Sequence, residues 1–262
     1  MKKGRAKKKI DWNKLALTGA WVVGICAWVW AAFVGAQTVV ARLAVWIFGV
    51  DTIRQPLGIG IVTLVAYLTA IGLIIMGPIW AKHIWRALSN KKPVKEVVTT
   101  REEMGLTGIP TWTDIGLGLA GMVVYLLLAS VVIGLMGNLP GFDAHEVQEI
   151  GFSRHMIGGN LVIALITLAV VAPITEEVLF RGWMYGKMRS RMPSKWGMVV
   201  SMVVVSAVFG VLHGQWNVAV NVFVMSIVMC AIREMTGTIW GAIILHIIKN
   251  AVAAYAVFML GM

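Results

Sequence analysis

Long runs of apolar residues alternate with short polar segments along almost the whole chain of 262 residues. Many of these runs reach the roughly 20 residues that an α-helix needs to cross the hydrocarbon core of a bilayer. Runs of that length predict membrane-spanning helices. The spans that the pattern favours are 15–36, 57–80, 115–136, 158–181, 197–213, 218–232 and 237–261.

The stretch QTVVARLAVWIFGVD, residues 37–51, lies between the first two runs. Its short length and its Arg42 favour an interfacial or re-entrant piece, although the same residues can extend the first span. Residues 89–114 are polar and predict a connecting loop with a short surface helix. The pattern therefore predicts an all-α polytopic transmembrane helical bundle of seven or eight spans.

The charged residues divide the loops into two sets. The tail 1–14 is basic, and the first run behind it is too long for a removed signal peptide and has no small-residue cleavage site. The basic loops 82–95 and 187–195 fall on the side of this tail, whereas the acidic loop 137–155 falls opposite. The positive-inside rule then predicts a multi-pass protein of the cell membrane with a cytoplasmic N-terminus.

Composition narrows the classes of protein further. Hydrophobic residues make up 59% of the chain and charged residues 13%, which excludes an ordinary soluble domain. The net charge of +11 comes from short loops beside apolar spans, so it favours the lipid bilayer as partner and no nucleic acid. Cys26 and Cys230 lie alone in separate runs, without the spacing of a disulfide or metal framework.

Ionisable and amide side chains enter the apolar runs at few positions. Because such groups cost free energy in hydrocarbon, each is a functional candidate. In the second half of the chain the candidates are Glu176, Glu177, Arg181, His213, His246 and Asn250. A glutamate, two histidines and an asparagine on three spans are the minimum set for activating a water and stabilising an oxyanion.

Helical spacing separates the two glutamates. Glu177 and Arg181 are four residues apart with the acid first, which favours an ion pair within one helix. Glu176 projects about 100° away from Glu177 and has no such partner. We therefore expect Glu176 to be the reactive acid or base and Arg181 to hold Glu177, although the pair taken alone is most simply a structural one.

The histidines show the same four-residue spacing. His246 and Asn250 share a helix face and could hold an oxyanion, whereas Lys249 points about 100° away from Asn250. Phe209 and His213 are also four residues apart. A histidine in a span is commonly a hydrogen-bonded packing residue and a phenylalanine a core residue, so spacing alone leaves both interpretations open.

Three short motifs connect these residues to a known family. EEVLFR, FGVLH and HIIKN resemble the motifs EExxxR, FxxxH and HxxxN of the CAAX protease and bacteriocin-processing family, also called the Abi family. This family contains the Ras-converting type of CAAX prenyl endopeptidase. The resemblance covers residue 158 to the end and divides the chain into a basic cytoplasmic tail (1–14), N-terminal helices and loops (15–157) and a catalytic core (158–262).

The resemblance implies an intramembrane glutamic endopeptidase that needs no cofactor. In that family's pattern Glu176 and His213 activate a water, and His246 and Asn250 stabilise the oxyanion. The same pattern gives a supporting role to Glu177, Arg181 and Phe209. Two histidines and a carboxylate could also bind zinc, but the chain lacks the HExxH motif of soluble zinc proteases, so no metal is expected.

The predicted boundaries leave a conflict of depth. They place Glu176 near the cytoplasmic end of its span and His213 at the opposite end of the next, yet the mechanism requires hydrogen-bond reach. We therefore expect the first of these helices to continue to about Met188. We also expect the chain after His213 to stay buried as a helix or a re-entrant turn.

The motifs do not select a substrate. A prenylated or otherwise lipidated peptide, a leader or pheromone peptide and a transmembrane segment all fit, and the oligomeric state is open. A catalytically idle membrane scaffold or bacteriocin immunity factor is the main alternative function. A transporter with a proton relay through Glu176, His213 and His246 is a second, although no inverted repeat supports it.

Overall fold

The computed structural model describes residues 11–89, 99–144, 146, 151–153 and 156–260. These residues form helices and loops, without a β-strand among them. The helices are α1 Trp12–Phe48, α2 Val50–Arg54, α3 Pro56–Leu88, α4 Trp112–Met136, α5 Gly158–Ile166, η1 Thr167–Val171, α6 Ala172–Glu177, η2 Val178–Met184, α7 Tyr185–Arg191, α8 Lys195–Val211, α9 Trp216–Thr236 and α10 Trp240–Leu260.

Six continuous helices in the described part of the chain are long and apolar enough to cross a membrane, and the six include Gly158–Arg191, which runs from α5 to α7. The shorter apolar helix α8 accompanies them. Many leucine, valine and tryptophan side chains on their outer faces are exposed, as expected of surfaces that contact lipid. The predicted all-α polytopic bundle is confirmed, and the protein is an integral membrane protein.

The stretch after the first predicted span extends that span. Residues 37–48 continue α1, so Arg42 lies within this long helix. Gly49, with φ of 81°, ends α1, and the five-residue α2 redirects the chain. Pro56 then begins α3, at a position where its missing N–H is not needed.

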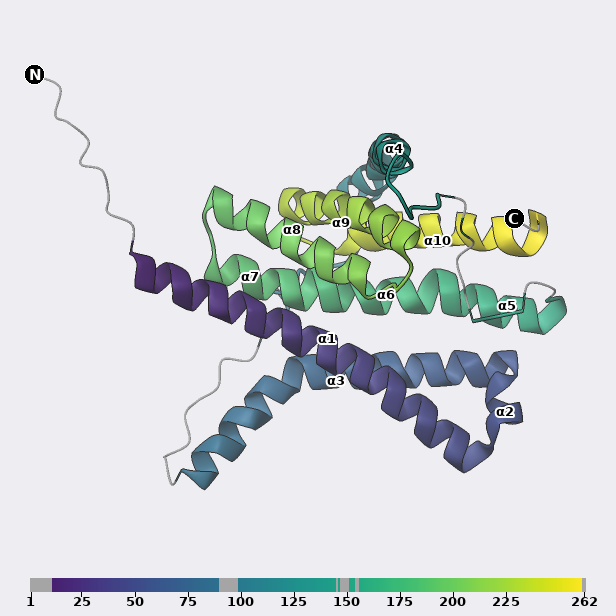
Figure 1. Cartoon of the computed structure of the whole chain (residues 1–262), viewed down its shortest axis with the longest axis horizontal. Helices are drawn as coiled ribbons and strands as arrows, with labels where there is room; N and C mark the ends of the chain where they lie inside the picture. The colour runs from purple at the N-terminus through teal and green to yellow at the C-terminus, as the bar shows by residue number, and fades with distance from the viewer. Residues whose placement is uncertain (1–10, 90–98, 145, 147–150, 154–155, 261–262) are drawn as a thin grey trace, which may run out of the picture.

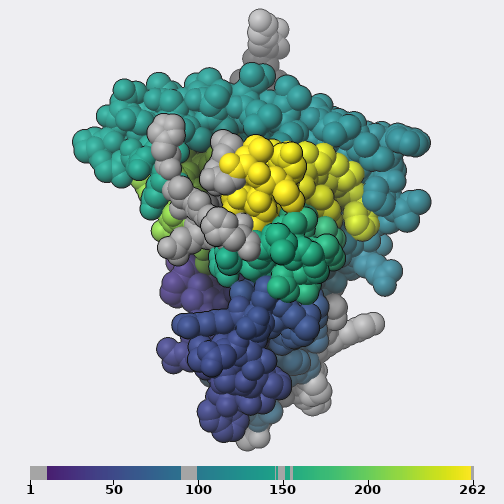
Figure 2. All heavy atoms as spheres, turned by 90° about the vertical axis from the view of Figure 1, so that its right-hand side faces the viewer, coloured from purple at the N-terminus to yellow at the C-terminus, as the bar shows by residue number. Residues whose placement is uncertain are grey.

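The helices form two layers, one on each side of the long helix α5–α7. α1 and α3 pack against each other, and α8, α9 and α10 lie on the other side of the long helix α5–α7 (Figure 1). In the side view, α1–α3 lie beneath α5 and the end of α10 (Figure 2). α4 is seen nearly end-on in Figure 1 and packs across α9 and α10. The long helix α5–α7 carries the two adjacent glutamates.

The hydrogen-bond pattern of this long helix changes twice. The π-helical segments η1 and η2 flank α6, whose last two residues are Glu176 and Glu177. A π segment bonds each N–H to the carbonyl five residues back, and such segments are frequent at functional sites. The local geometry therefore sets the two glutamates apart from the rest of the helix.

The first π segment leaves one carbonyl without its usual donor. The N–H of Ala172 bonds to the carbonyl of Thr167. In the same pattern the carbonyl of Leu168 faces the nitrogen of Pro173, which carries no hydrogen. The side-chain amide of Asn250 donates to this carbonyl at 3.0 Å. Helix α10 is thus tied to the long helix at the point where the backbone ladder is interrupted.

Candidate active site

Glu176 and His213 line one cavity. Its volume is about 200 Å³. The side chains around it are Phe33, Gln37, Tyr67, Glu176, Phe180, Phe209, Leu212 and His213. They come from α1 and α3 as well as from the segment that carries the three motifs. Both layers of the protein therefore contribute to the cavity.

An antiparallel hairpin brings Glu176 and His213 to the same depth. The long helix continues to Arg191, a little beyond the expected end near Met188, and a three-residue turn leads into α8. Glu176 precedes the end of its helix by 15 residues, and α8 rises for 17 residues before it ends at Val211. At 1.5 Å per residue both paths are about 23–25 Å long, so the end of α8 lies beside Glu176.

The chain after His213 differs from the expectation of a buried segment. It makes a tight turn with Gly214 at φ of 74°, and α9 begins at Trp216. Gly214 and Trp216 are exposed, whereas His213 is partly buried. The expected burial is therefore not found at these two residues.

His213 is oriented by the end of α8. Its Nδ1 lies 2.8 Å from the carbonyl oxygen of Phe209. A carbonyl can only accept, so Nδ1 carries the hydrogen and Nε2 of the neutral ring keeps its lone pair. The Phe209 ring packs edge-on against the imidazole at 4.9 Å between centroids. His213 is therefore held in the tautomer that can accept a proton at Nε2.

Glu176 is buried, and two helices outside its own reach its carboxylate. The Tyr67 hydroxyl on α3 donates a hydrogen bond to Oε1. Nε2 of His246 on α10 lies 3.8 Å from Oε2. The Phe33 ring of α1 packs edge-on against the ring of Tyr67. Three helices thus fix the position of the candidate base.

Glu177 serves two partners and is completely buried. Its Oε1 accepts from Nη1 of Arg181 at 2.9 Å and from Nδ1 of His246 at 2.8 Å. The Arg181 guanidinium also lies over the ring of Phe209 at 4.6 Å. The contact to His246 fixes Nδ1 as a donor and turns Nε2 toward Glu176. Glu177 therefore orients a histidine in addition to forming the expected ion pair.

Six of the seven predicted site residues lie together in one cluster, which contains the two glutamates. The seventh, Asn250, makes a different kind of contact. It follows His246 by one helical turn, but its amide contacts the carbonyl of Leu168 and it does not line the cavity. A backbone-satisfying role for this side chain is therefore visible, while its oxyanion role stays a prediction.

Sequence reasoning missed Tyr67. No motif surrounds it, and the signal is weak, because Tyr67 is one of two hydroxyl-bearing residues, with Thr69, in the apolar run VAYLTAIGL. Such a hydroxyl normally finds a hydrogen-bond partner when it is buried, but the sequence does not say which.

The histidine and carboxylate side chains of the site could in principle bind a metal ion. Among the described residues, no group of three or more His, Cys, Asp or Glu side chains is arranged to hold a metal ion. His246 Nδ1 is already occupied by Glu177. The expectation of metal-free chemistry itself stays a prediction.

Comparison with known proteins adds a family to this geometry. Residues 158–252 match the family model of the type II CAAX prenyl endopeptidases called Rce1-like. The predicted family resemblance is confirmed over this Rce1-like segment. It begins at the first residue of α5 and includes all three motifs.

One bacterial protein resembles about half of the chain. A protein of Escherichia coli, described as an uncharacterized 24.3 kDa protein, is 25% identical to the chain over 132 residues. The match covers 49% of this chain and 59% of the relative, so the chain spans less than two thirds of the relative's length. No solved structure matches the chain.

Proposed function

We propose that the protein is an intramembrane endopeptidase that hydrolyses peptide bonds of membrane-associated substrates with a water activated by Glu176 and His213. The observation that carries the proposal is the shared cavity of these two side chains, with His246 3.8 Å from Glu176. The match of the Rce1-like segment to a prenyl endopeptidase family supports the same class of reaction.

The proton transfers follow from the orientation of the groups. Glu176, assisted by Nε2 of His213, accepts a proton from water, and the hydroxide attacks the carbonyl carbon of the scissile bond. The C–N bond of the tetrahedral intermediate then breaks, and the proton passes to the leaving amine. One water is consumed, and the products are a carboxylate and an amine.

Donors for the oxyanion come from α10. When the His246 ring carries both hydrogens, Nδ1 remains on Glu177 and Nε2 can donate to the developing oxyanion. The Asn250 amide nitrogen has two hydrogens, and Leu168 accepts only one of them. We keep Asn250 as the second donor in this proposal.

The substrate side of the proposal is broader. The substrate is a membrane-associated peptide, lipidated or not, that reaches the cavity from the bilayer or from water. The protein resides in the cell membrane with its N-terminus in the cytoplasm, as the basic loops indicate.

The proposal is tested by comparing cells that carry the wild-type protein with cells that carry Glu176→Gln. Mass spectrometry of membrane-associated peptides should find fragments that only the wild type releases. Equal fragment sets, together with equal amounts of folded protein in the membrane, would overturn the peptidase. That result would favour an idle scaffold or immunity factor.

A further inference from the structure

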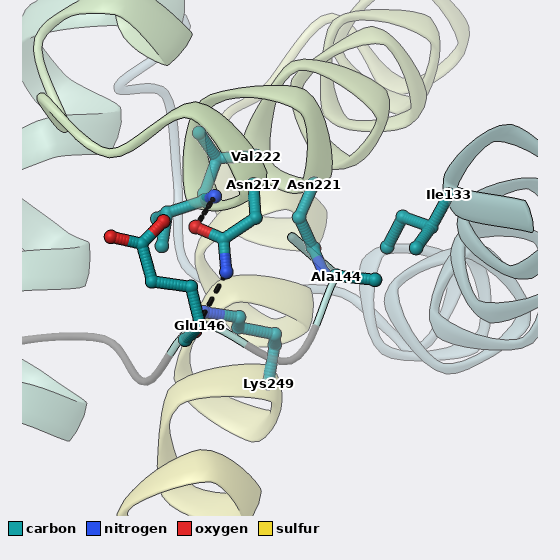
Figure 3. A pocket seen from close by; sticks show the side chains of 8 residues that line it. Ile133, Ala144, Glu146, Asn217, Asn221, Val222 and Lys249 are labelled. Carbon is teal, nitrogen blue, oxygen red and sulfur yellow. Dashed lines mark hydrogen bonds between the residues drawn. The ribbon is translucent and has the colours of Figure 1, made fainter. Parts of the chain in front are cut away.

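A second cavity of about 180 Å³ lies beside α10. It lies between α4, α9 and α10, and Lys249, Asn217 and Asn221 provide its polar lining (Figure 3). Lys249 is close enough to Glu176 and His213 to interact with both electrostatically. The cavity is thus a neighbour of the catalytic one, and Lys249 places a cationic group in its lining.

Lys249 has no salt-bridge or hydrogen-bond partner among the residues that the structure describes, although it lies in an apolar helix. Among the described residues, the carboxylate that lines the cavity belongs to Glu146. It lies 3.5 Å from the amide nitrogen of Gln215 and points away from the Lys249 amine in Figure 3. An ammonium group that leaves bulk water without a carboxylate in direct contact is costly, and an anionic ligand in the cavity would offset this cost.

The two asparagines have different hydrogen-bond states. Asn217 donates to the backbone carbonyl of Glu146 at 2.7 Å and accepts from the N–H of Val218 at 2.8 Å. Asn221 accepts from the Tyr125 hydroxyl at 2.5 Å. This contact directs the carbonyl oxygen of Asn221 to the tyrosine and leaves its NH₂ group with no acceptor in the described structure. The cavity therefore offers two donors, the Lys249 ammonium and the Asn221 amide.

We propose that this cavity binds a carboxylate of the peptide substrate, held by Lys249 and by the amide of Asn221. The inference rests on the proposed peptidase function and adds a charge preference to it. A carboxylate has two acceptor oxygens, which match the two donors. Its source is a free C-terminus or the side chain of an aspartate or glutamate.

Helix geometry places this subsite near the scissile bond. Lys249 follows His246 by three residues, which is 4.5 Å along the axis and about 60° short of a full turn. An extended peptide advances about 3.3 Å per residue. The bound carboxylate therefore lies within a few residues of the bond that is cut.

The competing role for Lys249 is that of a counter-charge for Glu176. Removal of the lysine would lower activity in both cases, so activity alone does not separate the two roles. Only the subsite makes binding depend on the charge of the substrate. A measurement of binding to an inactive protein, with substrates that differ in charge, is needed.

The experiment uses the full-length Glu176→Gln protein in lipid nanodiscs and three pools of random peptides. One pool ends in a free carboxylate, the second ends in an amide, and the third ends in an amide but contains one glutamate. Pools are mixed with the protein, and retained peptides are quantified by mass spectrometry. Retention of a carboxylate-bearing pool should exceed that of the neutral pool by about tenfold, the factor expected of one charge-assisted hydrogen bond.

Variants in the same background identify the residues responsible. Lys249→Met should abolish the preference, Lys249→Arg should keep part of it, and Asn221→Asp should abolish it by placing a carboxylate beside the lysine. Lys195→Met, which removes an exposed cation at the start of α8, is the matched control and should keep it. Asn221→Asp also provides a test if Lys249→Met does not fold.

Each outcome decides the proposal. Preference for the free-acid pool identifies the C-terminus as the source, and preference for the glutamate pool identifies a side chain. Equal retention of all pools, or retention of none, overturns the subsite. Cleavage of the same pools by the wild type is scored separately. Cleavage without a charge preference in binding would support the peptidase function and overturn the subsite. Charge-dependent binding without cleavage would support the subsite and overturn the peptidase function.

Discussion

The Tyr67 hydroxyl donates a hydrogen bond to the carboxylate of Glu176 across 109 positions of sequence. Tyr67 lies on α3, outside the Rce1-like segment, whereas Glu176 lies in its first motif. The candidate base is therefore oriented by a helix to which the family match does not extend. The N-terminal helices are part of the site's construction as well as its surroundings.

Tyr67→Phe tests this contact. The substitution removes only the hydroxyl, so Glu176 loses a group that fixes its position, while the ring of Phe33 keeps its neighbour. We expect kcat to fall about tenfold and KM to change little, because the lost contact acts on the reacting group. Steady-state kinetics on a peptide found by the cell comparison gives both constants. An unchanged kcat would show that Tyr67 only packs.

The two adjacent glutamates should respond differently to the same change. Glu177→Gln leaves the buried Arg181 without its counter-ion and His246 without its orienting acceptor. We expect a loss of about 3–5 kcal/mol in the free energy of unfolding, together with loss of turnover. Glu176→Gln should abolish turnover with a smaller loss of stability. Unfolding in detergent compares the two, and equal losses of stability would contradict the division of roles.

Asn250 combines a structural contact with a predicted catalytic one, and Pro173 offers a way to separate them. Asn250→Ala should cost about 1–3 kcal/mol of stability because the carbonyl of Leu168 loses its donor. Adding Pro173→Ala supplies a backbone N–H at the position that the π pattern requires.

The double variant should regain stability but not turnover if Asn250 also donates to the oxyanion. Unfolding and kinetic measurements on the two single variants and the double variant complete the cycle. Full recovery of turnover would restrict Asn250 to its contact with Leu168.

Metal-free chemistry predicts that chelators do not inhibit. Incubation of the purified protein with 1,10-phenanthroline or EDTA should leave turnover within about twofold of the untreated rate, since no step needs a bound ion. A soluble zinc protease in the same detergent serves as the control that must lose activity. Inhibition that added zinc reverses would replace the proposed mechanism with a metal-dependent one.

The presence of each long helix could be predicted because about 20 apolar residues in a row have few other stable forms in a membrane protein. Helix ends were less predictable, since hydropathy changes little where α1 passes residue 36 or where the long helix passes Arg181. The depth conflict between Glu176 and His213 arose from this, and the short α8 resolves it.

The partners of the site residues were only partly predictable. The ion pair between Glu177 and Arg181 follows from helical spacing, and the structure contains it. The contact of Glu177 with His246 depends on how α10 packs against α6, which spacing within one helix does not specify. Asn250 was assigned from its spacing to His246 and from its motif, and its contact with the carbonyl of Leu168 was not predictable, because the π segment that creates this backbone partner has no sequence signature.

The π segment η1 also gives the long helix a place where its length can change without disturbing the site. A π bulge holds one more residue than an α-helical turn, so deletion of a single residue such as Ala169 would let this stretch relax into a regular α-helix. The side chains on either side of the deletion would keep nearly their present directions, and Glu176 would still face His246. Deletion of one residue within the α-helical α6 would instead turn the following side chains by about 100°. Among homologous chains, a one-residue gap at η1 would therefore be compatible with the same active-site register, whereas a gap next to the paired glutamates would not.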